Sequence, residues 1–164
     1  MHANMNENNL NAINMDENNV NNNHEGEDQF QKYVLTDNAG YEELIDKDKT
    51  TEIIGFVEEI SAPRDVGKQN QFRLFKFVLS NGERKVSCCV WQKEIIVKYE
   101  PEIQINKVVH IIGGLTKVQG EKYAKKVSDG YVPFEIIIQP STEIEYLGFH
   151  NLQEKVTSSR YLEI

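Results

Sequence analysis

Short runs of β-branched and aromatic residues occupy the middle of the chain. Residues 50–61 (TTEIIGFVEEIS) and 72–80 (FRLFKFVLS) are two such runs, and each is typical of a β-strand. Asn81-Gly82 follows the second run and is a strong hairpin signal, so residues 84–91 (RKVSCCVW) are predicted to form a third strand, antiparallel to the second. Residues 62–71 (APRDVGKQNQ) contain Pro, Gly, Asn and charges, which predicts a long exposed loop between the first two strands.

After the third strand the apolar residues change to helical spacing. Ile95, Ile96 and Tyr99 would lie on one side of a helix, and Pro101 then limits its length, so the sequence predicts one short helix. The other predicted segments are a short helix or turn at residues 41–48, a strand at 107–114, a small hairpin at 115–126, a loop at 127–133, a fifth strand at 134–140, and a segment packed against the strands at 143–149.

This order of segments predicts the fold. Three antiparallel strands, a helix, and then two more strands match the five-stranded Greek-key OB-fold barrel, in which the helix closes one end. Gly55 within the first strand and Gly113-Gly114 at the end of the fourth suit the tight corners of a closing barrel. We therefore expect an all-β domain with a single short helix between strands three and four.

The two ends of the 164-residue chain differ from its middle. Residues 1–34 include 11 Asn within the first 23 positions and show no strand or helix period, so they are predicted to be a disordered acidic tail. The OB domain is expected at residues 41–147 and a C-terminal tail at 148–164. No apolar run approaches the roughly 18 residues that a membrane span requires. There is no basic residue before Lys32, so no secretory signal is predicted.

The net charge of −8 is concentrated in the N-terminal tail. Residues 1–34 hold six acidic residues and Lys32 alone as a base, a net charge of −5. The other 130 residues carry −3, with 17 Lys and Arg against 20 Asp and Glu. The predicted domain is therefore nearly balanced, and its charge does not exclude a nucleic-acid partner.

The residues that commonly carry catalysis or bind metals give no active-site pattern. Cys88 and Cys89 are adjacent, too few for a zinc site, and on a strand they point to opposite faces, so we interpret them as small apolar residues of an intracellular protein. His110 lies within an apolar strand and is expected in the core or barrel wall. The sequence lacks a phosphate-binding Gly loop, a nucleophile elbow and a suitably spaced carboxylate pair, so neither an enzyme nor a cofactor is predicted.

Trp91, the only tryptophan, lies at the end of the third predicted strand. In an unknown β protein a core position would be equally plausible, but OB folds bind single strands by stacking bases on exposed aromatic rings. Tyr123 is expected on the opposite side of the same groove. Four lysines lie around it, which suits a groove that follows a phosphate backbone: Lys117, Lys122, Lys125 and Lys126. For Tyr123 alone, ordinary hairpin packing is the alternative.

Residues 41–147 resemble the DNA-binding OB domains of the replication protein A large subunit, above all the first high-affinity domain. The resemblance is carried by INKVVHIIGG, LTKVQGEKY and PFEIIIQPSTEIE, together with the strand that ends in Trp91. It implies that Trp91 and Tyr123 stack on bases of single-stranded DNA and that Lys117 contacts the strand. It also implies that Arg64 and Lys68 of the first long loop close over the DNA. Ser87 departs from the family, which has an arginine there.

The resemblance implies a nuclear protein of DNA replication, repair, recombination or telomere maintenance. RNA and other OB-fold subunits remain alternative partners. A second function class stays open, in which the barrel binds protein as a subunit of a larger nucleic-acid complex. The acidic total and the single barrel favour that class, whereas Trp91, Tyr123 and the lysines favour single-stranded DNA.

Overall fold

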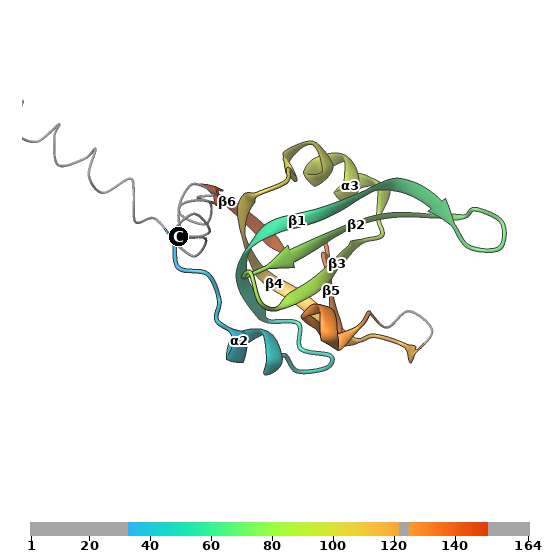
Figure 1. The fold of residues 1–164 in the computed structure, drawn as a ribbon. Coiled ribbons are helices and arrows are strands. Elements are labelled where there is room, and N and C mark those ends of the chain that lie inside the picture. Colours follow the sequence, from blue (N-terminus) through green and yellow to red (C-terminus); the bar gives the residue numbers. More distant parts are fainter. Residues whose placement is uncertain (1–32, 122–124, 151–164) are drawn as a thin grey trace, which may run out of the picture. The chain divides into compact units, whose positions relative to one another are not determined.

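Five strands close into a barrel in the part of the chain that the structure describes, residues 33–121 and 125–150 of a computed structural model (Figure 1). The described elements from Leu35 onward are α2 (Asn38–Glu42), β1 (Thr51–Val66), β2 (Phe72–Ser80), β3 (Lys85–Val90), α3 (Lys93–Tyr99), the 3-10 helix η2 (Glu100–Glu102), β4 (Lys107–Val118), the 3-10 helix η4 (Val127–Asp129), β5 (Tyr131–Ile137) and β6 (Glu143–Phe149). None of the helices in these residues is long and apolar enough to cross a membrane.

The strand pairing is that of an OB fold, which confirms the predicted fold class. The order is β1-β2-β3-β5-β4, and β1 also pairs with β4, so the sheet closes into a ring. The β3–β5 pair is parallel and the other pairs are antiparallel. Helix α3 lies between β3 and β4 in the chain, as expected, and contributes Ile95, Ile96 and Tyr99 to the core.

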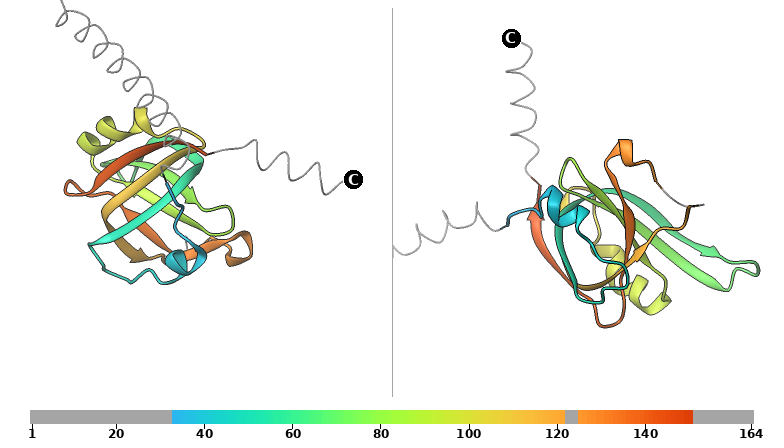
Figure 2. Two further views of the ribbon diagram at one scale, coloured as in Figure 1. Left: turned by 90° about the vertical axis from the view of Figure 1, so that its left-hand side faces the viewer. Right: turned by 90° about the horizontal axis from the view of Figure 1, so that it is seen from below.

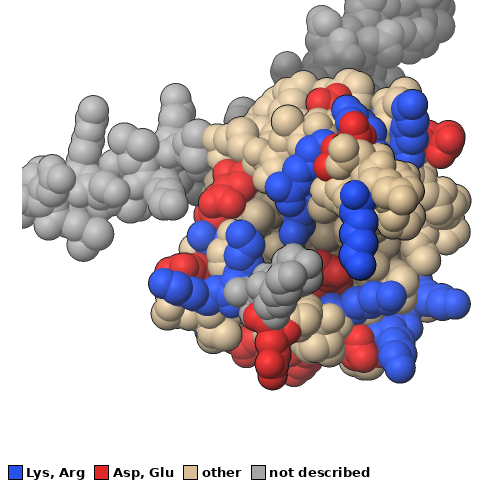
Figure 3. All heavy atoms as spheres, turned by 90° about the vertical axis from the view of Figure 1, so that its right-hand side faces the viewer, with Lys and Arg blue, Asp and Glu red and all other residues tan. Residues whose placement is uncertain are grey.

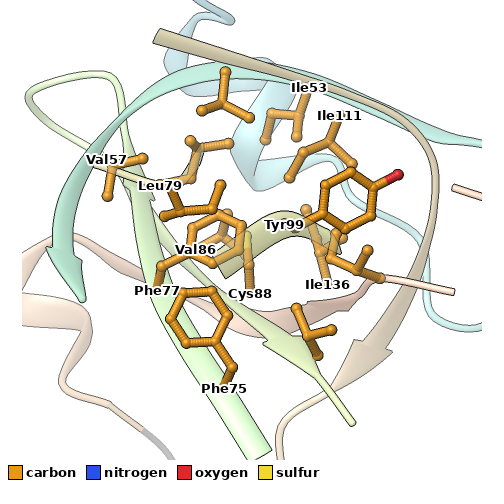
Figure 4. Packing of buried hydrophobic residues seen from close by; sticks show 14 of the residues in the cluster. Ile53, Val57, Phe75, Phe77, Leu79, Val86, Cys88, Tyr99, Ile111 and Ile136 are labelled. Carbon is orange, nitrogen blue, oxygen red and sulfur yellow. The ribbon is translucent and has the colours of Figure 1, made fainter. Parts of the chain in front are cut away.

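The barrel interior is filled by alternate residues of the strands. On β3, Val86, Cys88 and Val90 point inward, opposite Leu79, Phe77 and Phe75 of β2. Figure 4 shows the labelled side chains of these two strands converging with Tyr99 of α3 in one interior: Val86, Cys88, Leu79, Phe77 and Phe75.

The segment before β1 is bound to the barrel. The backbone N–H of Thr36 donates to the carbonyl of Ile54 at 3.0 Å, and the N–H of Ile54 donates to the Thr36 hydroxyl at 2.8 Å. Tyr41 in α2 is fully buried in the core. The helix is short and ends at Glu42, so the helix or turn predicted at residues 41–48 begins earlier and is mostly non-helical.

Two strands, β1 and β4, differ from the prediction because of pairing between distant segments. β1 continues to Val66, which pairs with Phe72, so much of the predicted loop forms a two-stranded arm with the start of β2 (Figure 1, Figure 2). We call residues 62–73 the arm. β4 does not end at Gly114, because Gly113 adopts a left-handed φ of 76° and the strand bends toward β5. The small hairpin predicted at residues 115–126 is therefore wrong, because residues 115–118 pair with β5.

A sixth strand extends the barrel. Residues 143–149, expected only to pack against the strands, form β6 and pair antiparallel with β4. β6 ends at Phe149, past the predicted end of the domain at Leu147. Residues 1–32 of the predicted N-terminal tail and 151–164 of the C-terminal tail lie outside the described residues.

Candidate nucleic-acid interface

A cleft of about 540 Å³ lies between the arm, the outer face of the barrel and the end of β4. The arm and the start of β2 contribute one side of it, β2, β3 and β5 contribute its floor, and the residues after β4 contribute the other side. The lining residues are Arg64, Asp65, Val66, Gly67, Asn70, Leu74, Lys76, Cys89, Trp91, Gln119, Gly120 and Glu135.

Trp91 enters this cleft because of the alternation along β3. Val90 points into the core, so the next residue points outward, and the strand has ended before α3 begins at Lys93. The Trp91 side chain is 39% exposed and lines the cleft. Of the two positions considered from the sequence, core or groove, the structure places it in the groove.

Only some of the other residues predicted from the sequence lie at this cleft in the structure. Arg64 lines the cleft from the arm, and Lys68 is exposed on the loop at the arm's tip. Lys117 is exposed on β4 and is the Cα partner of Glu135 in the cleft floor. Lys125 lies instead beside a separate cavity, with Glu59, Lys85, Lys126, Asp129 and Tyr131. Tyr123 and Lys122 lie outside the described residues.

Figure 3 looks onto the side of the molecule from which the arm projects. Lys and Arg side chains are spread over this side among fewer acidic ones. The cleft itself is lined by two cations, Arg64 and Lys76, and two acidic residues, Asp65 and Glu135.

Three charged residues that line the cleft were not predicted from the sequence: Asp65, Lys76 and Glu135. Asp65 lies on the arm and forms an ion pair with Arg73 at 3.0 Å. Lys76 of β2 is the Cα partner of Cys89, and Glu135 of β5 is the Cα partner of Ser87. Lys76 and Glu135 therefore share the outer face of the sheet with Trp91. The alternation along β2 could have identified Lys76, whereas Glu135 depends on the register between β3 and β5.

Glu135 influences which part of a nucleic acid could face the floor. Its Oε2 lies 3.5 Å from the Cys89 sulfur, and Lys117 lies beside it on β4. A carboxylate repels phosphate and only accepts hydrogen bonds, so it favours base amino groups such as cytosine N4. The phosphates of a bound strand would accordingly lie away from Glu135, toward Arg64 on the arm and Lys76 on the part of the floor that β2 forms.

The two cysteines have different positions, as the strand alternation predicts. Cys88 is fully buried in the core, and Cys89, though also buried, is on the outer face under the cleft. Burial raises the pKa of Cys88 and raises the pKa of Cys89 to about 12, with Glu135 adding to the effect on Cys89. Both thiols are therefore protonated at neutral pH and poorly nucleophilic. The interpretation as apolar residues holds for Cys88, whereas Cys89 also forms part of the cleft wall.

The raised thiol pKa values predict a loss of stability at alkaline pH. Their stabilising contribution is complete below the unfolded-state value of about 8.5 and decreases as pH rises toward the folded-state value. For Cys89 we expect a loss of roughly 1–2 kcal/mol between pH 8 and pH 10. Urea unfolding at the two pH values measures it, and Cys89→Ala should reduce the difference. An unchanged difference in that variant would contradict the assignment of Cys89.

His110 provides no catalytic arrangement. Its Nε2 lies 2.7 Å from Glu52 Oε1 and its Nδ1 lies 3.3 Å from Glu145 Oε2, so it bridges β1 and β6 on the barrel wall. Within residues 33–121 and 125–150, no group of three or more His, Cys, Asp or Glu side chains is placed to hold a metal ion.

Solved structures with similar folds include several proteins that bind single-stranded DNA. A replication protein A heterotrimer bound to ssDNA matches with a TM-score of 0.55 and 19% identity, over 69% of this chain and 25% of that chain. The barrel is an OB fold. The replication factor A related protein of Methanobacterium thermoautotrophicum matches with a TM-score of 0.47 and 15% identity, over 70% of this chain and 92% of that one.

A third match is the Schizosaccharomyces pombe Pot1pC bound to ssDNA, with a TM-score of 0.40 and 11% identity over 75% of this chain and 96% of that one. No model of a known protein family matches the sequence, and no curated protein matches it. This chain spans only a quarter of the matched replication protein A chain. At 19% identity, the likeness to the replication protein A chain shows the fold alone.

Proposed function

We propose that this OB-fold protein binds single-stranded DNA in the cleft between the arm and the end of β4, as an OB domain of the replication protein A type. The observation that carries the proposal is Trp91, an exposed aromatic ring in a cleft that also contains Lys76 and Arg64. A ring for base stacking beside cations for phosphates is what single-strand binding requires. The protein acts by binding and not as an enzyme.

The charges of the cleft decide which side of a bound strand, its bases or its phosphates, faces each part of the cleft. Bases face the part of the floor that β3 and β5 form, where Trp91 offers a stacking surface and Glu135 offers a hydrogen-bond acceptor. The phosphates lie toward Arg64, Lys76 and Lys117, so a part of the affinity depends on salt. We also propose a nuclear role in replication, repair, recombination or telomere maintenance, alone or with other OB-fold subunits.

The direct test is fluorescence anisotropy with labelled single-stranded DNA, duplex DNA and RNA of the same sequence over a salt series. We expect the single-stranded DNA to bind more tightly than the duplex, because only unpaired bases can reach the ring of Trp91. Comparison of RNA with single-stranded DNA of the same sequence shows whether the cleft distinguishes ribose from deoxyribose. Absence of single-strand binding at low salt would contradict the proposal and favour a protein partner.

Lys117→Ala should change the salt dependence of binding in a defined way. Each phosphate contact on a single strand contributes about 0.7 to the slope of log affinity against log salt, so the slope should fall by about that amount. The loss should be similar for all base compositions, because a lysine–phosphate contact carries no sequence information. The matched control is Lys98→Ala, since Lys98 lies on α3 and lines a different cleft, whereas Lys117 is the Cα partner of Glu135 in the cleft floor. Equal slopes for Lys117→Ala and the unmodified protein would contradict the contact.

A further inference from the structure

One edge of β6 is unpaired in the described part of the chain. β6 pairs antiparallel with β4 from Glu143, opposite Ile112, to Phe149, opposite Lys107. On its other side no strand pairs with it within residues 33–121 and 125–150. The views in Figure 2 show β6 in red beside β4. An unpaired edge presents alternate N–H and C=O groups that can accept another strand.

A second cleft lies beside this edge. It has a volume of about 680 Å³ and is lined by Lys98 and Tyr99 of α3, Glu102 of η2, residues 140–142, and Glu143 to Tyr146 of β6. Its lining shares no residue with the lining of the cleft that contains Trp91. Volumes of this size are typical of ligand sites, and the position beside a strand edge suits an extended chain.

The Tyr146 hydroxyl, in this second cleft, lacks a hydrogen-bond partner in the described structure. The oxygen is buried, while the Lys107 ammonium lies 4.5 Å from the centre of the ring. Burial, with Glu102 nearby, raises the pKa of Tyr146 to about 12, so the hydroxyl keeps its proton at neutral pH. A buried hydroxyl is normally bonded. A backbone carbonyl of an added segment is a suitable acceptor.

The charges around this edge favour a basic partner. Glu102, Glu143 and Glu145 line the second cleft, and Lys98 is the one cation among its lining residues. Glu143 and Glu145 lie two positions apart on β6 and therefore point to the same face of the strand. Residues of an added strand directly opposite them would lie within roughly 5 Å, where opposite charges stabilise and like charges destabilise.

A second copy of the chain is disfavoured at the same edge. Two β6 strands paired antiparallel would bring Glu143 and Glu145 of both copies onto one face. Between these glutamates, Ile144 packs against the core from the other face of β6. An added strand therefore fits this edge best when three successive residues of it are a cation, an apolar residue and a second cation.

We propose that β6 accepts an extended basic segment of a partner protein by strand addition, with Lys or Arg opposite Glu143 and Glu145 and an apolar residue opposite Ile144. This site is separate from the DNA-binding cleft, so the partner and a single strand can be bound at once. The proposal stands whether or not the cleft containing Trp91 binds DNA.

The test uses the full chain labelled with ¹⁵N and the acetylated, amidated peptide Lys-Val-Lys-Val-Lys. We expect the peptide to shift the backbone amide signals of residues 143–149, while the same peptide with Glu in place of Lys causes no shift. The reversed variant Glu143→Lys/Glu145→Lys should bind the Lys peptide at least about tenfold more weakly and should bind the Glu peptide instead. Circular dichroism verifies its fold, and Glu43→Lys/Glu94→Lys, two exposed positions outside the second cleft, is the control because it changes the net charge by the same amount.

Several results would overturn the proposal. They are an absence of β6 shifts at millimolar peptide, equal binding of both peptides, and shifts confined to residues 1–34, whose sequence carries a net charge of −5. Shifts of β6 that depend on protein concentration without peptide would assign the edge to a second copy. Anisotropy with labelled single-stranded DNA should be unchanged at saturating peptide, which separates this site from the DNA-binding cleft.

Discussion

Trp91→Ala should lower the affinity for single-stranded DNA by about one to two orders of magnitude while the fold remains intact. Stacking on an aromatic ring contributes roughly 1–3 kcal/mol per base, and 1.4 kcal/mol corresponds to a tenfold change in affinity. The ring is 39% exposed and lies outside the core cluster, so its removal leaves no core cavity. Anisotropy measures the affinity, and thermal unfolding followed by circular dichroism measures the stability.

Phe149→Ala is the matched control for the loss of an exposed aromatic ring. Phe149 is 58% exposed at the end of β6 and does not line the DNA-binding cleft, so its loss should leave the affinity for DNA unchanged. Because Trp91 is the only tryptophan, DNA should also quench the intrinsic fluorescence. Unfolding of Trp91→Ala, or emission that does not respond to saturating DNA, would contradict a role in stacking.

The parts of the fold that depend on local signals could be predicted from the sequence. The β2–β3 hairpin follows from Asn81-Gly82, where the Asn81 side-chain oxygen accepts from the backbone N–H groups of Glu83 and Arg84 at 2.8 and 2.7 Å. The spacing of Ile95, Ile96 and Tyr99 predicted α3 and its buried face. Both features are determined by neighbouring residues along the chain, which a single sequence displays.

The missed parts of the fold depend on partners that are distant in the sequence. Ala62 to Val66 carries loop-like residues, yet this segment extends β1 because Arg64 and Val66 pair with Leu74 and Phe72 of β2. β6 forms because β4 offers it an edge, and neither its length nor its composition distinguishes it from a packed tail. Pairing of this kind overrides local propensity.

The residues of the candidate site also fall into two groups: those that local sequence signals predict and those whose position depends on distant strand pairing. Trp91 was identified from its place at the end of a strand, which is a local property. Glu135 enters the cleft floor because β5 aligns it with Ser87 of β3, a register that the sequence alone does not display. Lys125 was expected in the same groove but lies at another cavity, because the path of the chain after Gly120 decides its position. The sequence therefore indicated Trp91 and Arg64 but not the other charged residues of the cleft, Asp65, Lys76 and Glu135.

Gly55→Ala should destabilise the protein by about 3 kcal/mol. A methyl group at this buried position of β1 would overlap the Tyr41 hydroxyl and would lie 2.7 Å from Leu79 Cγ and 2.8 Å from the carbonyl oxygen of Ser80. The carbonyl belongs to the β2 backbone and cannot rotate away, so the strand or the segment that carries Tyr41 must shift. Overpacking of this kind typically costs about 1–3 kcal/mol, and three simultaneous contacts place Gly55 at the upper end. The thermal midpoint should fall by roughly 10–15 °C, at about 4 °C per kcal/mol for a folded domain of this size.

The matched control for this substitution is Gly120→Ala. Apart from its two chain neighbours, no atom of the described residues would lie within 4 Å of a methyl group at Gly120, and the residue is exposed. The thermal midpoint should therefore stay within about a degree of the unmodified protein. Since both variants add the same methyl group, the difference between them isolates the contact of β1 with Tyr41, Leu79 and Ser80. Equal midpoints for the two variants would show that the segment before β1 can move aside, and that Tyr41 does not hold it rigidly against the barrel.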